Sequence, residues 1–322
     1  MHKKILTIII PSYKTSKYID DCLPFFVIDE IRQDINIFLI DDGSPDDSYF
    51  KALKYQKKYP GLFYAVHKEN GGHGSVINYA IKNLIDTKYF KVIDGDDWVD
   101  KNGLVSLVNF LKSTDSDLII SDFTKCFTNA KVYVKCFDTE RTRNYLGYQI
   151  TLHSATFKTI IFQKNNILVR EKCFYEDNEY SLFPLEFVQT ISYCPHNVYM
   201  YRLDNSGQSV SVNSLLQHEK DYLNVKNDIL AKYKFWIKNI NNEKLITYTS
   251  YILSGFYLWL FQNNLLKKRK KNELRIIQEE LKQNQAIYKI VKKEKIYRLI
   301  SFLDFNLLPI KRLLLNLKYR NK

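Results

Sequence analysis

The chain is poor in residues that cross-link or punctuate a fold, with five cysteines, seven prolines and ten glycines in 322 residues. The cysteines are odd in number and none forms a Cys-x-x-Cys pair, which argues against a disulfide framework and against a zinc site. We therefore expect free thiols and a reducing compartment. The five positions are Cys22, Cys126, Cys136, Cys173 and Cys194.

Long apolar runs are missing as well. The amino terminus carries one run of six residues, 5–10, which Pro11 stops and which is too short for a signal peptide. The longest later candidate, residues 252–261, is about half of the ~20 residues that a membrane span requires. The sequence therefore predicts a cytoplasmic protein, or one bound peripherally to the inner face of the membrane.

Acidic residues are scarce near the carboxyl end. The net charge of the chain is +13, and residues 265–322 hold 17 Lys and Arg against 5 Asp and Glu. A basic segment that also carries Leu, Ile and Phe is typical of an interfacial helix on a membrane. The alternative is an ordinary helical subdomain that packs on the core or on a second copy of the chain. No nucleic-acid-binding module is visible, so no nucleic acid is expected as a partner.

Three apolar runs mark buried strands early in the chain, at 5–10, 35–40 and 89–93. Each is rich in Ile, Val or Phe and ends in polar or turn residues, the pattern of a strand covered on both faces. Segments with helical spacing alternate with these runs, as in a doubly wound α/β fold. Further strands are predicted at 63–67 and 118–123, helices at 16–31, 47–59 and 75–86, and a hairpin at 124–137.

Beyond about residue 215 the pattern changes to long helical segments. That part of the chain is rich in Asn, Lys and Leu and holds one glycine, Gly255. We therefore predict two domains, an α/β domain over 1–215 and a basic, α-helical region over 216–322.

Half of the glycines lie in three short polar stretches, DDGS (41–44), NGGHGS (70–75) and DGDD (94–97). Each follows a predicted strand, so all three are expected at the carboxyl edge of the sheet, where open α/β folds bind ligands. Taken singly, they would be a helix-capping turn, a flexible loop and a solvated turn. NGGHGS is not a P-loop, because no Gly-Lys-Ser/Thr follows it. Together the three stretches predict a ligand site.

Asp94, Asp96 and Asp97 stand within four residues, where their carboxylates would repel one another. A divalent cation offsets such repulsion, and oxygen ligands suit Mg²⁺ or Mn²⁺. Magnesium takes one or two protein carboxylates and completes its shell with water and substrate phosphates. The expected ligand is therefore a metal diphosphate.

These stretches, in this order, resemble the motifs of the family 2 glycosyltransferases, inverting enzymes of the GT-A fold. The likeness covers about residues 4–212 and runs through IIIPSYKTSKYIDDCL, IFLIDDGSPDDS, KENGGHGSVIN, YFKVIDGDDWVD and CFYEDNEY. It implies a Rossmann-like, mostly parallel sheet flanked by helices. It also implies transfer of a hexosyl or N-acetylhexosaminyl group from a nucleotide-diphosphate sugar, with a UDP-sugar as the expected donor. The acceptor would be a glycan or lipid-linked intermediate of cell-surface polysaccharide or glycoconjugate synthesis.

The resemblance also assigns roles to single positions. Asp177 matches the family's general base, which takes the proton of the acceptor hydroxyl, although the pair Glu176-Asp177 is equally typical of a helix N-terminus. Asp96 and Asp97 match the metal-binding carboxylates, and Asp94 matches the group that holds ribose. Further contacts with the nucleotide sugar are predicted at Pro11, Tyr13, Asp42, Gly72, His73, Asn78 and Arg202.

The chain departs from the family pattern in two places. Ile77 stands where many members have an Arg, whose charge Lys68 or His73 would have to supply. The QxxRW motif of processive synthases is missing, and the region reads YRLDNSGQSVS (201–211), so we expect one sugar to be added per encounter.

Two other functions stay open. A nucleotidyltransferase also binds metal-bound nucleotide phosphates, but PSYKTSKY (11–18) lacks the glycine-rich signature of that class. A degenerate family member could act as partner or scaffold of another transferase, although the full set of aspartates argues against this reading.

Overall fold

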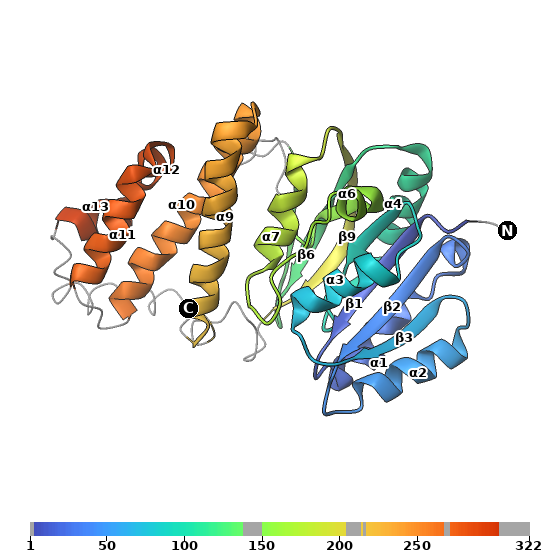
Figure 1. Cartoon of the computed structure of the whole chain (residues 1–322). Coiled ribbons are helices and arrows are strands. Elements are labelled where there is room, and N and C mark those ends of the chain that lie inside the picture. The colour runs from blue at the N-terminus through green and yellow to red at the C-terminus, as the bar shows by residue number, and fades with distance from the viewer. Residues whose placement is uncertain (1–2, 138–149, 204–213, 215–216, 267–270, 303–322) are drawn as a thin grey trace. The chain divides into compact units, whose positions relative to one another are not determined.

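The computed structural model describes residues 3–137, 150–203, 214, 217–266 and 271–302 (Figure 1). The chain forms two compact units, one reaching to Asp221 and the other starting at Tyr222. Each unit has its own hydrophobic core. Most of the YRLDNSGQSVS region and the basic residues 267–270 and 303–322 lie outside the described residues.

One sheet of nine strands forms the centre of the first unit, and half of it is parallel. This half contains β1 (Leu6–Ser12), β2 (Ile35–Asp42), β3 (Phe63–Lys68) and β4 (Tyr89–Val92). The strand order is β3-β2-β1-β4, and each neighbouring pair is parallel. Strands β1, β2 and β4 are buried along almost their whole length, as their apolar runs predict.

The other half of the sheet is mixed. It contains β5 (Trp98–Val99), β6 (Leu118–Cys126), β7 (Lys131–Val134), β8 (Ala155–Lys158) and β9 (Ile191–Arg202). Strand β8 is antiparallel to β4 and β6, β9 is parallel to β6, and β6 and β7 form the predicted hairpin. Strand β5 pairs with the end of β9, which brings Met200 opposite Trp98. The end of β9 therefore lies beside the DGDD turn.

Helices pack against this sheet, α2 on β2 and β3, α3 on β1 and β2, and α4 on β9 (Figure 1). The helix predicted over 16–31 ends at Cys22, because Pro24 cannot continue it and the chain goes on as two 3₁₀ turns. The helical and 3₁₀ segments are α1 (Ser16–Cys22), η1 (Leu23–Phe26), η2 (Asp29–Ile31), α2 (Ser48–Lys58), α3 (His73–Asn83), α4 (Lys101–Ser113), α6 (Thr159–Lys164), α7 (Asp177–Leu182) and η3 (Phe183–Glu186).

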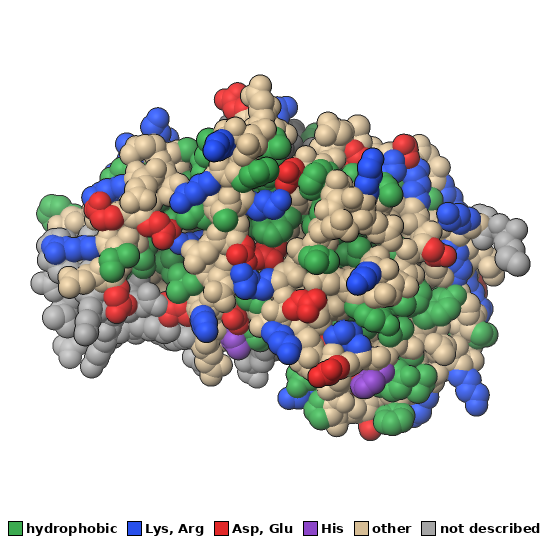
Figure 2. Space-filling view, viewed as in Figure 1, with side chains coloured by type: hydrophobic (Ala, Val, Ile, Leu, Met, Phe, Trp, Pro, Cys, Tyr) green, Lys and Arg blue, Asp and Glu red, His purple; other side chains and the backbone are tan. Residues whose placement is uncertain are grey.

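The second unit is helical throughout its described residues, as the pattern beyond residue 215 predicts. It consists of α9 (Glu219–Asn239, which starts in the first unit), α10 (Glu243–Leu266), α11 (Lys271–Gln283), α12 (Gln285–Val291) and α13 (Lys295–Phe302). Trp236 and Tyr257 are fully buried in it. Among the described residues, no helix combines the length and apolar character needed to cross a bilayer. On the face in Figure 2, Lys and Arg side chains are interspersed with Asp and Glu.

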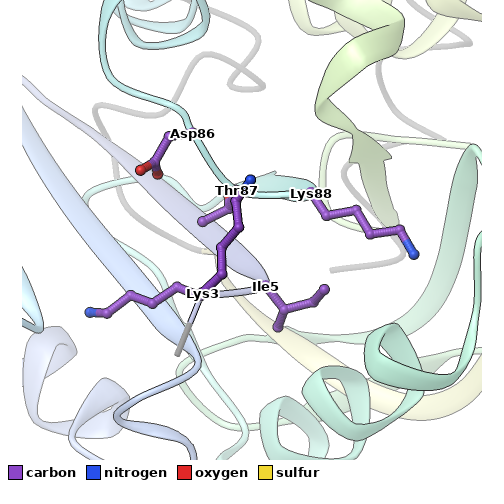
Figure 3. Close-up of a pocket in the computed structure, with 6 residues that line it drawn as sticks. Lys3, Ile5, Asp86, Thr87 and Lys88 are labelled. Atoms are coloured by element: carbon purple, nitrogen blue, oxygen red, sulfur yellow. The ribbon is translucent and has the colours of Figure 1, made fainter. Parts of the chain in front are cut away.

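A shallow hollow of about 420 Å³ lies at the amino ends of β1 and β4 (Figure 3). Both strands run away from it toward the DGDD turn and its neighbouring loops. The hollow is therefore at the opposite edge of the sheet from the predicted ligand site. Its lining residues are Lys3, Lys4, Ile5, Asp86, Thr87 and Lys88.

Candidate active site

The three glycine-rich stretches meet at the carboxyl edge of the parallel strands. Gly95 lies so close to Pro11 that a Cβ at position 95 would come within 2.6 Å of the Pro11 carbonyl oxygen. The stretch 70–75 in turn contacts both Asp42 and Asp94. The loops that follow β1, β2, β3 and β4 thus form one connected region, at the edge where open α/β folds bind ligands.

Asp42 organises the NGGHGS loop. Its side chain is 2% exposed and accepts hydrogen bonds from Lys68 Nζ at 2.7 Å, Gly71 N at 3.0 Å and Gly72 N at 2.7 Å. Gly72 has a φ of +84°, in the left-handed region that favours glycine. The nucleoside contact predicted for Asp42 would come from a carboxylate that already holds this loop with both oxygens.

The same loop packs closely on the segment that leads to Asp177. A Cβ at Gly74 would lie 2.1 Å from the carbonyl oxygen of Arg170, so the backbones touch there. Asn78 donates to the Val169 carbonyl at 2.9 Å and to Glu171 at 3.0 Å, and it accepts from Val169 N at 3.0 Å. Asn78 is 8% exposed. The amide of Asn78 therefore anchors residues 169–171, and the donor contact predicted for this residue stays a prediction.

His73 joins the loop to two carboxylates. Its Nδ1 lies 2.6 Å from Glu176 Oε1, and its Nε2 lies 3.0 Å from Asp94 Oδ1. Burial alone would lower the pKa of the imidazole, but the two carboxylates raise that pKa well above its usual value. Burial likewise opposes ionisation of Asp94, yet the bond from His73 brings the pKa of Asp94 below its usual value. His73 thus bridges the two carboxylates with its two ring nitrogens.

Strand β9 supplies the groups that hold the DGDD turn. The hydroxyl of the fully buried Tyr199 donates to Asp97 Oδ2 at 2.6 Å and accepts from Asp94 N at 3.1 Å. The backbone N of Arg202 donates to Asp97 Oδ1 at 2.7 Å, and its Nε donates to the Asp96 carbonyl at 2.8 Å. Arg202, predicted as a phosphate contact, therefore lies directly against the turn.

The carboxylates of the turn differ in how open they are. Asp97 is 2% exposed, and burial followed by the charges of Asp94 and Asp96 raises its pKa well above the usual value. Asp96 is partly exposed, and no other residue in the described part of the chain donates a hydrogen bond to its carboxylate. Burial, then the charge of Asp94, raises the pKa of Asp96 to about 6.

This crowding of carboxylates fits a divalent cation. Asp94, Asp97 and His153 each offer a ligand atom, and these atoms lie within 4.8 Å of one another. Asp96 adds an open carboxylate on the same turn. Carboxylate oxygens suit Mg²⁺ or Mn²⁺, and a cation would relieve the carboxylate repulsion that, after burial, raises the pKa values of Asp96 and Asp97.

His153 and Lys91 were not singled out from the sequence. Burial lowers the pKa of His153 to about 4, so its ring is neutral, which is the form that binds metals. Lys91 is fully buried and donates to the carbonyls of His153 at 2.8 Å and Ala155 at 3.1 Å. Burial lowers the pKa of Lys91 to about 7. One feature of the sequence could have drawn attention to Lys91 and His153, namely a lysine inside the apolar run YFKVI (89–93).

Asp177 stands at the start of α7, directly after Glu176. Burial, followed by the charge of Glu176, raises the pKa of Asp177 to about 7. A carboxylate with a pKa near neutrality is suited to general base catalysis. The helix-terminus interpretation of this pair also holds, so the two interpretations are compatible.

The first strand brings the two remaining predicted residues to the same edge. Pro11 is buried in β1, and Tyr13 follows the strand with 47% of its side chain exposed. The ring of Tyr13 has Lys14 Nζ 4.9 Å from its centre. An exposed aromatic ring directly after the carboxyl end of β1 has the chemistry expected for a contact with a nucleobase.

A parallel half-sheet that ends in an acidic turn fits the GT-A fold that the sequence motifs predict. The chain belongs to glycosyl transferase family 2, whose sequence model matches residues 7–176. It is therefore a glycosyltransferase, and the fold and family predicted from the motifs are confirmed.

Comparisons with known proteins agree with this assignment. The uncharacterized glycosyltransferase MG060 homolog of Mycoplasma pneumoniae is 23% identical over 291 residues, which cover 82% of this chain and 96% of that protein. The poly(ribitol-phosphate) beta-glucosyltransferase of Bacillus spizizenii is 32% identical over 117 residues, 36% of this chain and 18% of that protein. The crystal structure of TarS 1–349 of S. aureus in complex with UDP-GlcNAc has a TM-score of 0.64 at 18% identity, covering 96% and 87% of the two chains.

Proposed function

We propose that the chain transfers a hexosyl or N-acetylhexosaminyl group from a UDP-sugar to a glycan or lipid-linked acceptor, with inversion, a metal requirement and one sugar per encounter. The observation that carries the proposal is the hydrogen-bonded link from Asp94 through His73 to Glu176, the residue directly before Asp177. This link joins the proposed base to the turn that would hold the diphosphate.

The donor end of the site follows from the loops. Tyr13 offers an exposed ring for the base, and the buried Pro11 fixes the turn that carries it. Gly72, whose backbone packs on Lys172, would meet the donor through the loop 70–75. Arg202 lies beside the turn, where it can contact a phosphate. A UDP-sugar is favoured because a structural neighbour, TarS, was solved with UDP-GlcNAc.

The reaction is a single displacement in which the chain supplies the base. Asp177 takes the proton of an acceptor hydroxyl while that oxygen bonds to the anomeric carbon. The bond from this carbon to the diphosphate oxygen breaks, and the nucleoside diphosphate leaves with the electron pair. Bound Mg²⁺ or Mn²⁺ supplies positive charge for the leaving diphosphate. Asp96 and Asp97, with Asp94 and His153 beside them, are the residues that would hold the ion, and Tyr199 keeps the turn in place.

We also propose where the acceptor is met. The basic region 265–322 would hold the enzyme, peripherally, on the anionic inner face of the membrane, where lipid-linked acceptors are available. The relative from Bacillus spizizenii acts, by its name, on poly(ribitol-phosphate), which supports an acceptor in cell-surface polymer synthesis. A homodimer formed through the same helices is the competing use of this region.

A donor screen tests the proposal. Purified full-length protein is incubated with Mn²⁺ or Mg²⁺ and a panel of nucleotide sugars, and released nucleoside diphosphate is quantified with and without EDTA. We expect one UDP-sugar to be hydrolysed slowly in the absence of acceptor and EDTA to stop it. A protein that neither binds nor turns over any nucleotide sugar in the presence of metal would contradict the proposal.

A further inference from the structure

The structure assigns His73 a positioning role in the proposed reaction: its imidazole bridges Asp94 and Glu176 and so couples the diphosphate turn to the start of α7, where Asp177 stands. The inference rests on the proposed function and adds a residue through which the two halves of the site hold each other in register.

The bridge is formed by short contacts from both ring nitrogens. Nδ1 lies 2.6 Å from Glu176 Oε1, and Nε2 lies 3.0 Å from Asp94 Oδ1. Glu176 is 4% exposed and is the residue directly before Asp177. A buried carboxylate held at its side chain also fixes the backbone that carries the next residue. The orientation of Asp177 therefore depends on the bond from His73 to Glu176.

His73 is itself held on a rigid platform. On one side of it, a Cβ at Gly72 would lie 3.0 Å from Lys172 N, and on the other, a Cβ at Gly74 would lie 2.1 Å from the Arg170 carbonyl oxygen. Both distances show that the loop backbone is packed directly on residues 170–172. The backbone on both sides of His73 is therefore fixed, and its imidazole contacts two carboxylates.

A side chain that can reach two carboxylates at once is needed at this position, and the two ring nitrogens of His73 meet Asp94 and Glu176 there. Of the two basic residues near the missing family Arg, Lys68 donates to Asp42 at 2.7 Å and to Ser75 at 2.8 Å. His73 is the one that contacts Asp94 and Glu176.

The test compares His73→Ala and His73→Gln with wild type, using the UDP-sugar found in the donor screen. We expect kcat to fall about 10- to 100-fold in His73→Ala, the usual loss when a group that orients a reacting residue is removed. The donor KM and the affinity for UDP with Mn²⁺ should stay within about twofold. Glutamine keeps a hydrogen-bond donor without the charge, so its loss should be smaller. His196→Ala removes an exposed histidine of β9 and should leave kcat unchanged.

A double variant separates coupling from simple loss of a side chain. If His73 acts through Glu176, then His73→Ala combined with Glu176→Gln should lose no more activity than the more damaged single variant. Additive losses would overturn the inference, as would a kcat within twofold of wild type or a loss confined to donor KM. Melting temperatures close to that of the wild type would show that the variants are folded. If His73→Ala does not fold, His73→Gln takes its place in the comparison. Failure of the proposed function would show instead in the wild-type protein, as absence of turnover.

Discussion

Asp97 and Asp177 are both carboxylates whose pKa burial raises, yet their surroundings differ. Both oxygens of Asp97 accept hydrogen bonds, from Tyr199 and from the backbone of Arg202, so this carboxylate is engaged in holding the turn. Asp177 is partly exposed, and its carboxylate accepts a hydrogen bond from the side chain of the neighbouring Asn178. Asp97 is therefore fixed in its position within the turn, whereas Asp177 is available to react.

The pH dependence of the reaction should report the base. Asp177 has to be ionised to accept a proton, and its pKa is raised to about 7. We therefore expect kcat/KM, at saturating metal, to rise with pH and to level off above about pH 7. Asp177→Asn should lower the activity by about 10²- to 10⁴-fold and remove this rise. A wild-type profile that is flat between about pH 5.5 and 8.5 would exclude Asp177 as the base.

Removing the Tyr199 hydroxyl should loosen the turn. In Tyr199→Phe the buried Asp97 and the Asp94 backbone each lose a partner, so we expect a loss of about 1–3 kcal/mol in the free energy of unfolding. Urea unfolding followed by circular dichroism measures this. Tyr64→Phe is the matched control, because the Tyr64 hydroxyl makes one exposed contact of 3.5 Å with the Gly61 carbonyl. Equal losses of unfolding free energy in both variants would show that the Tyr199 hydroxyl does not stabilise the turn.

At the scale of elements, the strands and the edge at which their loops meet could be predicted from the sequence. Runs such as 5–10 and 89–93 are apolar because both faces of the parallel strands are buried, and that signal is local. Tyr199 and His153 could not be predicted, because they reach the turn only through the pairing of β9 with β5 and of β8 with β4. No local pattern encodes such distant pairing.

The contact between the NGGHGS loop and residues 170–172 can be tested by a substitution that adds one methyl group to the loop. Gly74→Ala would place a Cβ 2.1 Å from a backbone oxygen, which forces the two segments apart. We expect a loss of about 1–3 kcal/mol in stability, together with reduced kcat. Gly255→Ala makes the same change in α10 with nothing within 4 Å, and should stabilise the protein by about 0.5–1 kcal/mol. A Gly74→Ala protein as stable and active as wild type would contradict the close packing described here.

At the scale of the whole molecule, charge is divided unevenly along the chain. Residues 265–322 carry an excess of 12 positive charges, from 17 Lys and Arg against 5 Asp and Glu, so the rest of the chain is close to neutral. If this region acts at an anionic membrane, then binding should be electrostatic and weakened by salt.

Vesicle co-sedimentation measures this directly. The full-length protein should bind vesicles that contain phosphatidylglycerol, and binding should fall as salt is raised from about 0.1 to 1 M, where the screening length shortens from about 10 to 3 Å. Charge reversal in the basic region, by Lys267→Glu, Lys268→Glu and Arg269→Glu, should weaken vesicle binding. The control set on α2, Lys54→Glu, Lys57→Glu and Lys58→Glu, should leave vesicle binding unchanged. Vesicle binding that does not respond to the first set would favour a protein partner for this region.

In the proposed reaction, the acidic turn binds the metal diphosphate while Asp177 takes the proton of the acceptor. Calorimetric titration of UDP with Mn²⁺ into wild type, Asp96→Ala and Asp177→Asn, paired with donor turnover by the same three proteins, separates these two roles. We predict that Asp96→Ala loses both UDP binding and turnover, and that Asp177→Asn keeps wild-type UDP affinity while losing turnover. An Asp96→Ala protein that binds UDP with Mn²⁺ as wild type does, or an active Asp177→Asn protein, would contradict the account.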